Sequence, residues 1–213
     1  MLLHIVRHGQ STGNISTDDI PDAELTPLGQ QQVRETALYF ADKSITHVHS
    51  SPLVRAMATG SAIAAAAGLR QVEVWPELQE HRYSLHRGFG RPELLQRFPL
   101  AVFSASVEAE GWDHGGETYE SALERGIAAI AALRERHATD DRVVVATHGA
   151  FANCLLRAVF HTPPALRLYM PINNCSISQV RFVGPHQQPA DDYYPADVEV
   201  FCVNAVSHLS EVS

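Results

Sequence analysis

Apolar runs and helix-like repeats alternate along this chain. Short apolar runs, each bounded by polar or turn-forming residues, predict buried strands. Strands are predicted at residues 2–6, 46–50, 72–75 and 142–146. Between them, apolar residues recur every three or four positions, which is typical of one face of a helix. The predicted helices cover residues 27–40, 52–67, 92–98, 119–137 and 151–160.

Local signals mark individual helices. Thr26 is a typical N-cap, and Pro27 suits the first helical position because its missing N–H would be unpaired there anyway. Within the helix at 119–137, Leu123, Ile127 and Ile130 are expected to form one apolar stripe. Strands that alternate with such helices favour an α/β domain.

The remaining segments complete the predicted sheet. The run 142–146 is apolar after Arg142, so its strand is expected at the centre. Two further strands are predicted at 176–183 and 197–203, joined by a loop rich in Gln, Pro and Asp. We expect residues 80–115 to be irregular apart from the short helix at 92–98. With no repeat or linker, we expect one domain over residues 1–213, a three-layer α/β/α sandwich with a mostly parallel, mixed sheet.

Composition narrows the function classes. The 213 residues are 45% hydrophobic and 19% charged, as in ordinary globular proteins, and the net charge is −8. Nucleic-acid surfaces need clustered Lys and Arg, so no nucleic-acid partner is expected. A small anionic substrate remains compatible, because it responds to the local field of a pocket.

Cysteine use and targeting signals bear on location. Cys154, Cys175 and Cys202 have no disulfide or metal-ligand spacing, which fits a reducing compartment. The first apolar run is short and no basic residue precedes it, unlike a signal peptide. The alanine-rich stretch 62–67 is far below the ~20 apolar residues that span a bilayer. We therefore expect a cytoplasmic protein without a membrane partner.

Candidate chemistry begins where the first strand ends. Arg7 and His8 follow the apolar run directly, and Gly9 permits a sharp turn there. Arginine offers a fork of donors that matches phosphate oxygens. Neutral imidazole is a competent nucleophile near pH 7, because its ordinary pKa is about 6.5. A cation beside a nucleophile indicates chemistry on an anion, for which phosphate is the natural candidate.

Two other strand ends carry similar residues. Ser51 follows the second strand, with Arg55 one turn into the next helix, and His148 follows the strand at 142–146. Ligands of open α/β sheets bind at the carboxyl ends of the strands. If these strands are neighbours, two arginines and two histidines meet in one crevice, where helix N-termini add N–H groups.

Each residue also has a purely structural interpretation. Arg55 taken alone could be a solvated helix residue, and His148 could satisfy buried backbone groups. Their joint placement makes that account the weaker one. His47 and His49 share a strand face, a pattern compatible with a metal, but no third ligand has a suggestive spacing. No metal site is therefore predicted.

Five ordered motifs carry a family resemblance. They are Arg7-His8-Gly9 with Asn14, residues 22–29, residues 51–56 with Thr59, residues 115–118, and Thr147-His148-Gly149. In this order and spacing the chain resembles the histidine phosphatase superfamily, which includes the cofactor-dependent phosphoglycerate mutases, from Leu3 to about Ser178. The resemblance implies a phosphoglycerate mutase-like fold.

The resemblance also implies site roles. His8 would attack phosphorus and carry a phosphohistidine, while Arg7, Arg55 and His148 bind the phosphoryl oxygens. Two more residues are expected beside the substrate, namely Asn14 and Gly149. Glu80 aligns with the acid that protonates the leaving oxygen, and Glu77 is its nearest competitor. No metal or other cofactor is implied.

The chain departs from the commonest family pattern after Glu80. Arg82, Arg87 and Arg91 make this stretch basic, which fits either contact with a second anionic group of the substrate or a solvated loop. Of the three, Arg82 is expected to bind substrate. The segment also looks shorter than the substrate-covering part of the mutases, and a less enclosed site would admit water.

The expected function is therefore hydrolysis of a small phosphorylated metabolite by a metal-independent phosphomonoesterase. A cofactor-dependent mutase and a non-catalytic phospholigand-binding protein are the alternatives. The sequence does not identify the substrate, and a homo-oligomer stays open.

Overall fold

A mixed β-sheet forms the centre of the protein in a computed structural model that describes residues 1–18, 20, 22–183 and 197–213. Within these residues, seven strands have the order β5-β3-β2-β7-β1-β8-β9. They are β1 (Leu2–Arg7), β2 (His47–Ser50), β3 (Val72–Val74), β5 (Ala101–Phe103), β7 (Arg142–Thr147), β8 (Ile177–Phe182) and β9 (Val198–Ala205). The first five are parallel to one another. β8 pairs antiparallel with β1, and β9 pairs antiparallel with β8. The predicted mixed, mostly parallel sheet is confirmed, with β7 at its centre.

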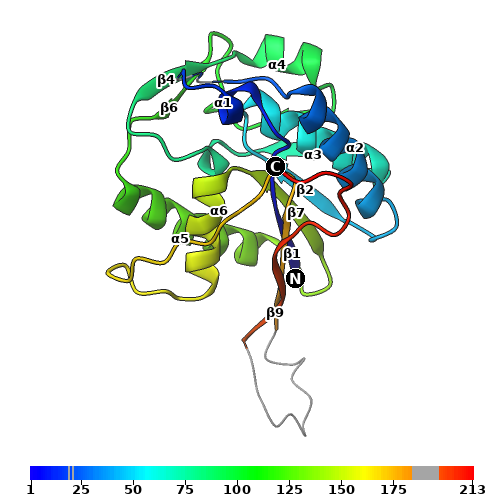
Figure 1. Ribbon diagram of the computed structural model, residues 1–213, viewed down its shortest axis with the longest axis vertical. Helices are drawn as coiled ribbons and strands as arrows, with labels where there is room; N and C mark the ends of the chain where they lie inside the picture. Colours follow the sequence, from blue (N-terminus) through cyan, green and yellow to red (C-terminus); the bar gives the residue numbers. More distant parts are fainter. Residues whose placement is uncertain (19, 21, 184–196) are drawn as a thin grey trace, which may run out of the picture.

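Helices cover both faces of this sheet (Figure 1). Helices α2 (Pro27–Phe40) and α3 (Val54–Ala66) lie on one side, and α5 (Tyr119–Arg136) and α6 (Gly149–Val159) on the other. Neighbouring residues of β7 enter different cores, because strand side chains alternate in direction. Val144 packs with the α2 and α3 side, and Val143 with the α5 and α6 side. The three-layer α/β/α arrangement is confirmed.

The helix-start signals act as expected, but one apolar position was assigned wrongly. Thr26 caps α2 by accepting a hydrogen bond from the Gly29 N–H at 3.0 Å. On α5, Ile127 is 57% exposed, whereas Leu123 and Ile130 are buried. The buried stripe runs instead through Gly126, where a Cβ atom would lie 3.0 Å from the backbone of α6. Close approach of the two helices there shifts the contact face away from Ile127.

The segment 80–115, predicted as irregular, contains regular structure. Strands β4 (Leu85–Gly88) and β6 (Trp112–Gly115) pair antiparallel, α4 (Arg91–Arg97) confirms the short helix, and β5 joins the edge of the main sheet. Neither β4 nor β6 shows strand-like alternation. Their pairing and the burial of Trp112 hold them instead, which a hydrophobic pattern cannot reveal. The segment lies at the same end of the molecule as the short helix α1 (Thr12–Ile15) (Figure 1).

The carboxyl-terminal strands β8 and β9 confirm the expectations for 176–183 and 197–203. The connecting Gln/Pro/Asp loop lies outside the described residues. Among the helices that the structure describes, none combines the length and the apolar character needed to span a bilayer.

Candidate active site

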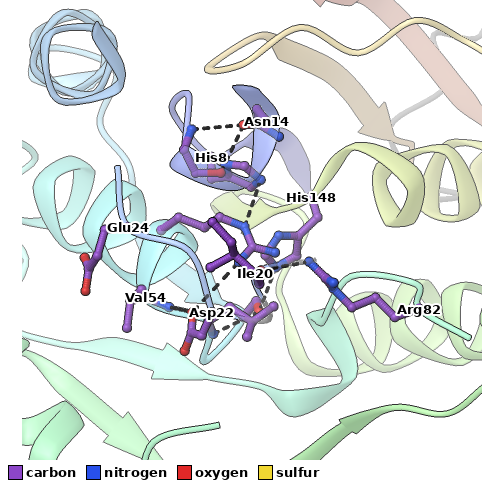
Figure 2. Close-up of polar contacts among 12 residues, drawn as sticks. His8, Asn14, Ile20, Asp22, Glu24, Val54, Arg82 and His148 are labelled. Atoms are coloured by element: carbon purple, nitrogen blue, oxygen red, sulfur yellow. Dashed lines mark hydrogen bonds and ion pairs between the residues drawn. The ribbon is translucent and has the colours of Figure 1, made fainter. Parts of the chain in front are cut away.

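Three adjacent strands deliver the predicted site residues to one place. Because β7 lies between β1 and β2, the residues that follow these three strands meet at their carboxyl ends. The rings of His8 and His148 are 5.1 Å apart between centroids. Figure 2 shows both rings grouped with Asp22 and Arg82 around a common centre. The predicted convergence is confirmed.

His8 is held as a neutral imidazole in one tautomer. Its Nδ1 lies 2.7 Å from the carbonyl oxygen of Gly9, which can only accept, so Nδ1 carries the proton and Nε2 keeps its lone pair. Burial lowers the pKa of His8 well below its ordinary value, and the nearby charges of Arg55 and Arg7 lower it further. The ring therefore stays neutral at pH 7, with the lone pair of Nε2 facing the pocket.

Two arginines surround that nitrogen. Arg55 is buried and donates from Nε to His8 Nε2 at 3.2 Å, while Arg7 donates from Nη1 to the carbonyl of Ile172 at 2.6 Å. Burial lowers the pKa of Arg55 to about 10, and the carboxylates of Asp22 and Glu80 oppose that shift. Both guanidinium groups are thus cationic at pH 7.

His148 lies beside these two cations. Ser51 Oγ accepts from the N–H of Leu53 at 3.3 Å and lies 2.9 Å from His148 Nε2. The tautomer of His148 decides which of these two groups is the donor. Burial lowers the pKa of His148 well below its ordinary value, followed by the effect of Arg55.

Three buried nitrogen atoms of this pocket have no hydrogen-bond partner among the described residues. They are Arg7 Nε, Arg55 Nη1 and His148 Nδ1, of which the two guanidinium nitrogens are donors. Buried polar groups are nearly always paired, so unpaired donors beside His8 indicate a ligand that brings acceptors. The oxygens of a phosphoryl group meet that requirement without a metal.

Glu80 lies beside the pocket at the start of α6. Its carboxylate accepts from the N–H groups of His81, Ala150 and Phe151 at 2.9–3.3 Å. Its charge opposes the burial that lowers the pKa of Arg7, which places it close to that cation as well. Glu77 is exposed, so Glu80 is the better placed of the two predicted acids.

Asn14 and Gly149 occupy supporting positions. Asn14 Oδ1 accepts from Asn174 Nδ2 at 3.1 Å and from Ser11, which leaves the amide nitrogen as the donor end. Asn174 Nδ2 also donates to the carbonyl of His8 at 2.9 Å. A Cβ atom at Gly149 would lie 3.3 Å from Arg7 Nε. A side chain there would crowd the guanidinium that faces the substrate.

The three arginines after Glu80 divide into two groups. Arg82 approaches the site: its Nη2 donates to the carbonyl of Ile20 at 3.3 Å, and its charge lowers the pKa of His148 behind burial and the nearer cations. Arg87 pairs instead with exposed Asp113 at 3.1 Å, and Arg91 donates to backbone carbonyls. Only the first of the three lies near the phosphate pocket.

Sequence reasoning missed Asp22 as a site residue. Its Oδ1 accepts from the Val54 N–H at 2.8 Å and lies 3.8 Å from Arg55 Nη1. Burial raises the pKa of Asp22 to about 6, against the opposing effects of Val54 and Arg55. Asp22 therefore joins the loop before α2 to the start of α3. The segment 22–29 was matched as a motif, but no spacing rule connects it with Arg55.

Replacement of Asp22 by asparagine is expected to stabilise the fold at neutral pH. The pKa of Asp22 is about 6 in the folded protein and 3.8 ordinarily, so the folded protein binds the proton more tightly. The free energy of unfolding of the wild type therefore falls as pH rises between these two values. Asparagine does not titrate and avoids this loss, which amounts to roughly 2–3 kcal/mol above pH 6. Urea unfolding at pH 4 and pH 7 will show the two proteins alike at pH 4 and Asp22→Asn more stable at pH 7. Parallel profiles would contradict the assignment, and exposed Asp113→Asn serves as the control.

Comparison with known proteins agrees with this geometry. A phosphoglycerate mutase-like protein 4 of Arabidopsis thaliana is 29% identical over 183 residues, covering 83% of this chain and 77% of that protein. A probable phosphoglycerate mutase of Yersinia enterocolitica is 30% identical over 191 residues, covering 84% and 83%.

Solved structures share the fold. A phosphoserine phosphatase of Entamoeba histolytica superposes with a TM-score of 0.69 at 19% identity, covering 98% of both chains. A mycobacterial glucosyl-3-phosphoglycerate phosphatase gives 0.66 at 22% identity, covering 96% of this chain and 99% of that one. The family model of the histidine phosphatase superfamily, branch 1, matches residues 3–190. This chain belongs to the histidine phosphatase superfamily.

Proposed function

We propose that the protein hydrolyses a small phosphomonoester through a phosphohistidine on His8, without a metal. The observation that carries the proposal is the set of unpaired buried nitrogens on Arg7, Arg55 and His148 beside Nε2 of His8, whose lone pair faces the pocket. A phosphomonoester bears about −1.5 to −2 charges at neutral pH, so cations must surround it before a nucleophile can approach.

In the first step His8 Nε2 forms a bond to phosphorus while the bond from phosphorus to the ester oxygen breaks. The lone pair that attacks accepts the Arg55 Nε–H in the ligand-free protein. A phosphoryl oxygen must therefore replace His8 Nε2 as the acceptor of the Arg55 Nε–H. This exchange frees the nitrogen for attack and places the positive charge of Arg55 against the phosphate. The carbonyl of Gly9 supports the positive charge that develops on the ring through the Nδ1–H.

The leaving oxygen needs a proton, which we assign to the carboxyl group of Glu80. In the second step water attacks phosphorus, the nitrogen–phosphorus bond breaks, and Glu80 takes the proton that the water loses. The cycle returns His8 and Glu80 to their starting states and releases alcohol and phosphate.

Replacement of Glu80 by glutamine should affect substrates according to their leaving groups. Glutamine keeps an oxygen for the α6 N–H groups but has no proton to transfer in this role. We expect kcat/KM for an alkyl phosphate to fall about 10²–10³-fold, and for p-nitrophenyl phosphate less than tenfold, because nitrophenolate leaves without protonation. The matched control is Glu77→Gln on the neighbouring surface. Equal losses on both substrates would remove Glu80 as the acid.

A groove beside the pocket is large enough to hold the alcohol part of the ester. This groove of about 690 Å³ runs past Ala150, at the α6 end where Glu80 binds, to Tyr83, Tyr119 and Tyr169. Arg167 also lines it. Tyrosines with a nearby cation suit a polar or ring-containing group that carries a negative charge. This supports a phosphorylated metabolite as substrate.

Hydrolysis and phosphoryl transfer are separated by one experiment. The matched curated relatives named as probable phosphoglycerate mutases favour the mutase alternative, so 3-phosphoglycerate is supplied with catalytic bisphosphoglycerate. Hydrolysis predicts free phosphate from 3-phosphoglycerate, phosphoserine or another member of a sugar-phosphate and nucleotide panel. Rapid formation of 2-phosphoglycerate with little free phosphate would overturn the hydrolase in favour of the mutase.

A further inference from the structure

A second group of histidines lies at the opposite end of the sheet from His8. His47 and His49 project from β2 on one face, as their spacing predicts, but their partners come from elsewhere in the chain. His137 ends α5, and Asp141 immediately precedes β7. These residues occupy the amino-terminal ends of the strands, away from the carboxyl ends that carry the phosphate pocket, and take no part in the proposed reaction.

Three of them offer a ligand set. One ligand atom each from His47, His137 and Asp141 can be chosen so that all three lie within 4.8 Å of one another. His137 Nδ1 is 3.3 Å from Asp141 Oδ2, and His47 Nδ1 is 3.9 Å from Asp141 Oδ1. Ligand atoms of a tetrahedral zinc ion with bonds of about 2.0–2.1 Å lie about 3.3 Å apart. Separations within 4.8 Å exceed that spacing by at most about 1.5 Å, which the side chains would have to close around the ion.

The surrounding hydrogen bonds are incomplete without a cation. His49 Nε2 and His137 Nε2 are 2.8 Å apart, so one of them must carry the proton. If His137 donates from Nδ1 to Asp141, its Nε2 must accept, and the proton of His49 lies on Nε2. Buried His49 Nδ1 then has a lone pair facing the Glu73 carboxylate at 3.9 Å, and it has no hydrogen-bond partner among the described residues.

A metal on His137 Nδ1 resolves this conflict. The ring proton then moves to Nε2 and is donated to His49 Nε2, which shifts the His49 proton to Nδ1, toward Glu73. Metal-bound histidines usually donate their second N–H to such a partner. Asp141 is oriented as well, because its Oδ2 accepts from the Ala138 N–H at 2.9 Å.

We propose that His47, His137 and Asp141 bind a zinc ion, with His49 as the positioning residue of His137. Two imidazoles and one carboxylate suit zinc better than magnesium or calcium, which prefer oxygen ligands only. The side chains of His47 and Asp141 are 36% and 22% exposed, so an ion can enter and keep a water ligand. Zinc there would tie the end of α5 to β2 and β7, a stabilising role separate from catalysis.

The test measures zinc binding directly. Protein without a histidine tag, stripped with EDTA, is titrated with Zn²⁺ by calorimetry, and with Co²⁺ while its visible absorption is followed. We expect one tight equivalent, tetrahedral cobalt bands, and a midpoint of thermal unfolding raised by about 5 °C in excess zinc. His47→Asn and Asp141→Asn should each weaken binding at least tenfold and lose the thermal shift. His49→Gln should weaken it about 10–100-fold.

Two controls exclude other histidines. His161→Asn changes an exposed histidine outside this cluster, and His8→Ala removes one from the phosphate pocket. Both should keep the tight equivalent, and phosphatase activity of the His47 and Asp141 variants should match wild type. The absence of a stoichiometric equivalent in the wild type would overturn the proposal. So would equal affinity in wild type and His47→Asn, or loss of the tight equivalent in His8→Ala.

Discussion

Replacement of His8 by alanine is expected to lower kcat by at least about 10⁴-fold and leave a folded protein. The variant loses the pocket nitrogen whose lone pair is set by a proton fixed on the other side of the ring. The arginines that bind phosphate remain, but water would have to attack the ester directly, and loss of a nucleophile commonly removes most of the catalytic advantage. Steady-state phosphate release measures the loss.

Covalent trapping tests the same substitution independently. A brief reaction with a radioactive phosphoryl donor, quenched in alkali, should label wild-type protein and not His8→Ala, and acid should release the label. His161→Asn, an exposed change of the same residue type, should label like wild type. Label retained in His8→Ala would place the intermediate elsewhere. No label and no phosphate release in the wild type across the substrate panel would favour a phospholigand-binding protein.

Arg55→Lys should cost about 10²–10³-fold in kcat/KM although the charge is kept. Arg55 donates from Nε to His8, and its Nη1 lies 3.8 Å from Asp22 Oδ1 without a hydrogen-bond partner among the described residues. Lysine has a single ammonium group and cannot present two donors in the fixed geometry of a guanidinium. Removal of one such donor from a transition state typically costs this amount.

The matched control is Arg87→Lys. Arg87 is exposed on β4 and pairs with Asp113, so the same chemical change is expected to leave kcat/KM within about twofold of wild type. Binding of vanadate, measured by inhibition, should weaken in Arg55→Lys and not in Arg87→Lys. An Arg55→Lys enzyme with wild-type kcat/KM would show that the guanidinium fork is dispensable, and the proposed phosphate pocket would then be wrong.

The sequence predicted the centre of the site well because its parts obey a local rule. Arg7 ends β1 and His8 follows it, Ser51 follows β2 and His148 follows β7, and carboxyl ends of parallel strands lie at one edge of a sheet. The order of the strands was inferred from the family resemblance. The central position of the strand at 142–146 was predicted separately, from its apolar residues.

Contacts between distant segments were beyond such rules. Asp22 reaches Arg55 through a loop, and Asn174 reaches both Asn14 and the His8 backbone from the other end of the chain. The partners of His47 likewise come from the end of a distant helix. No periodicity marks these pairs, since each depends on how separate elements pack and on the local turn geometry.

The strand order also constrains when the enzyme can become active. β7 is inserted between β1 and β2, yet a ribosome makes it long after both. A nascent chain that ends before β7 leaves β1 and β2 without their shared neighbour, and His8 stays apart from His148. Contacts this distant in sequence form slowly. The two rings therefore come together only once the middle of the sheet is filled.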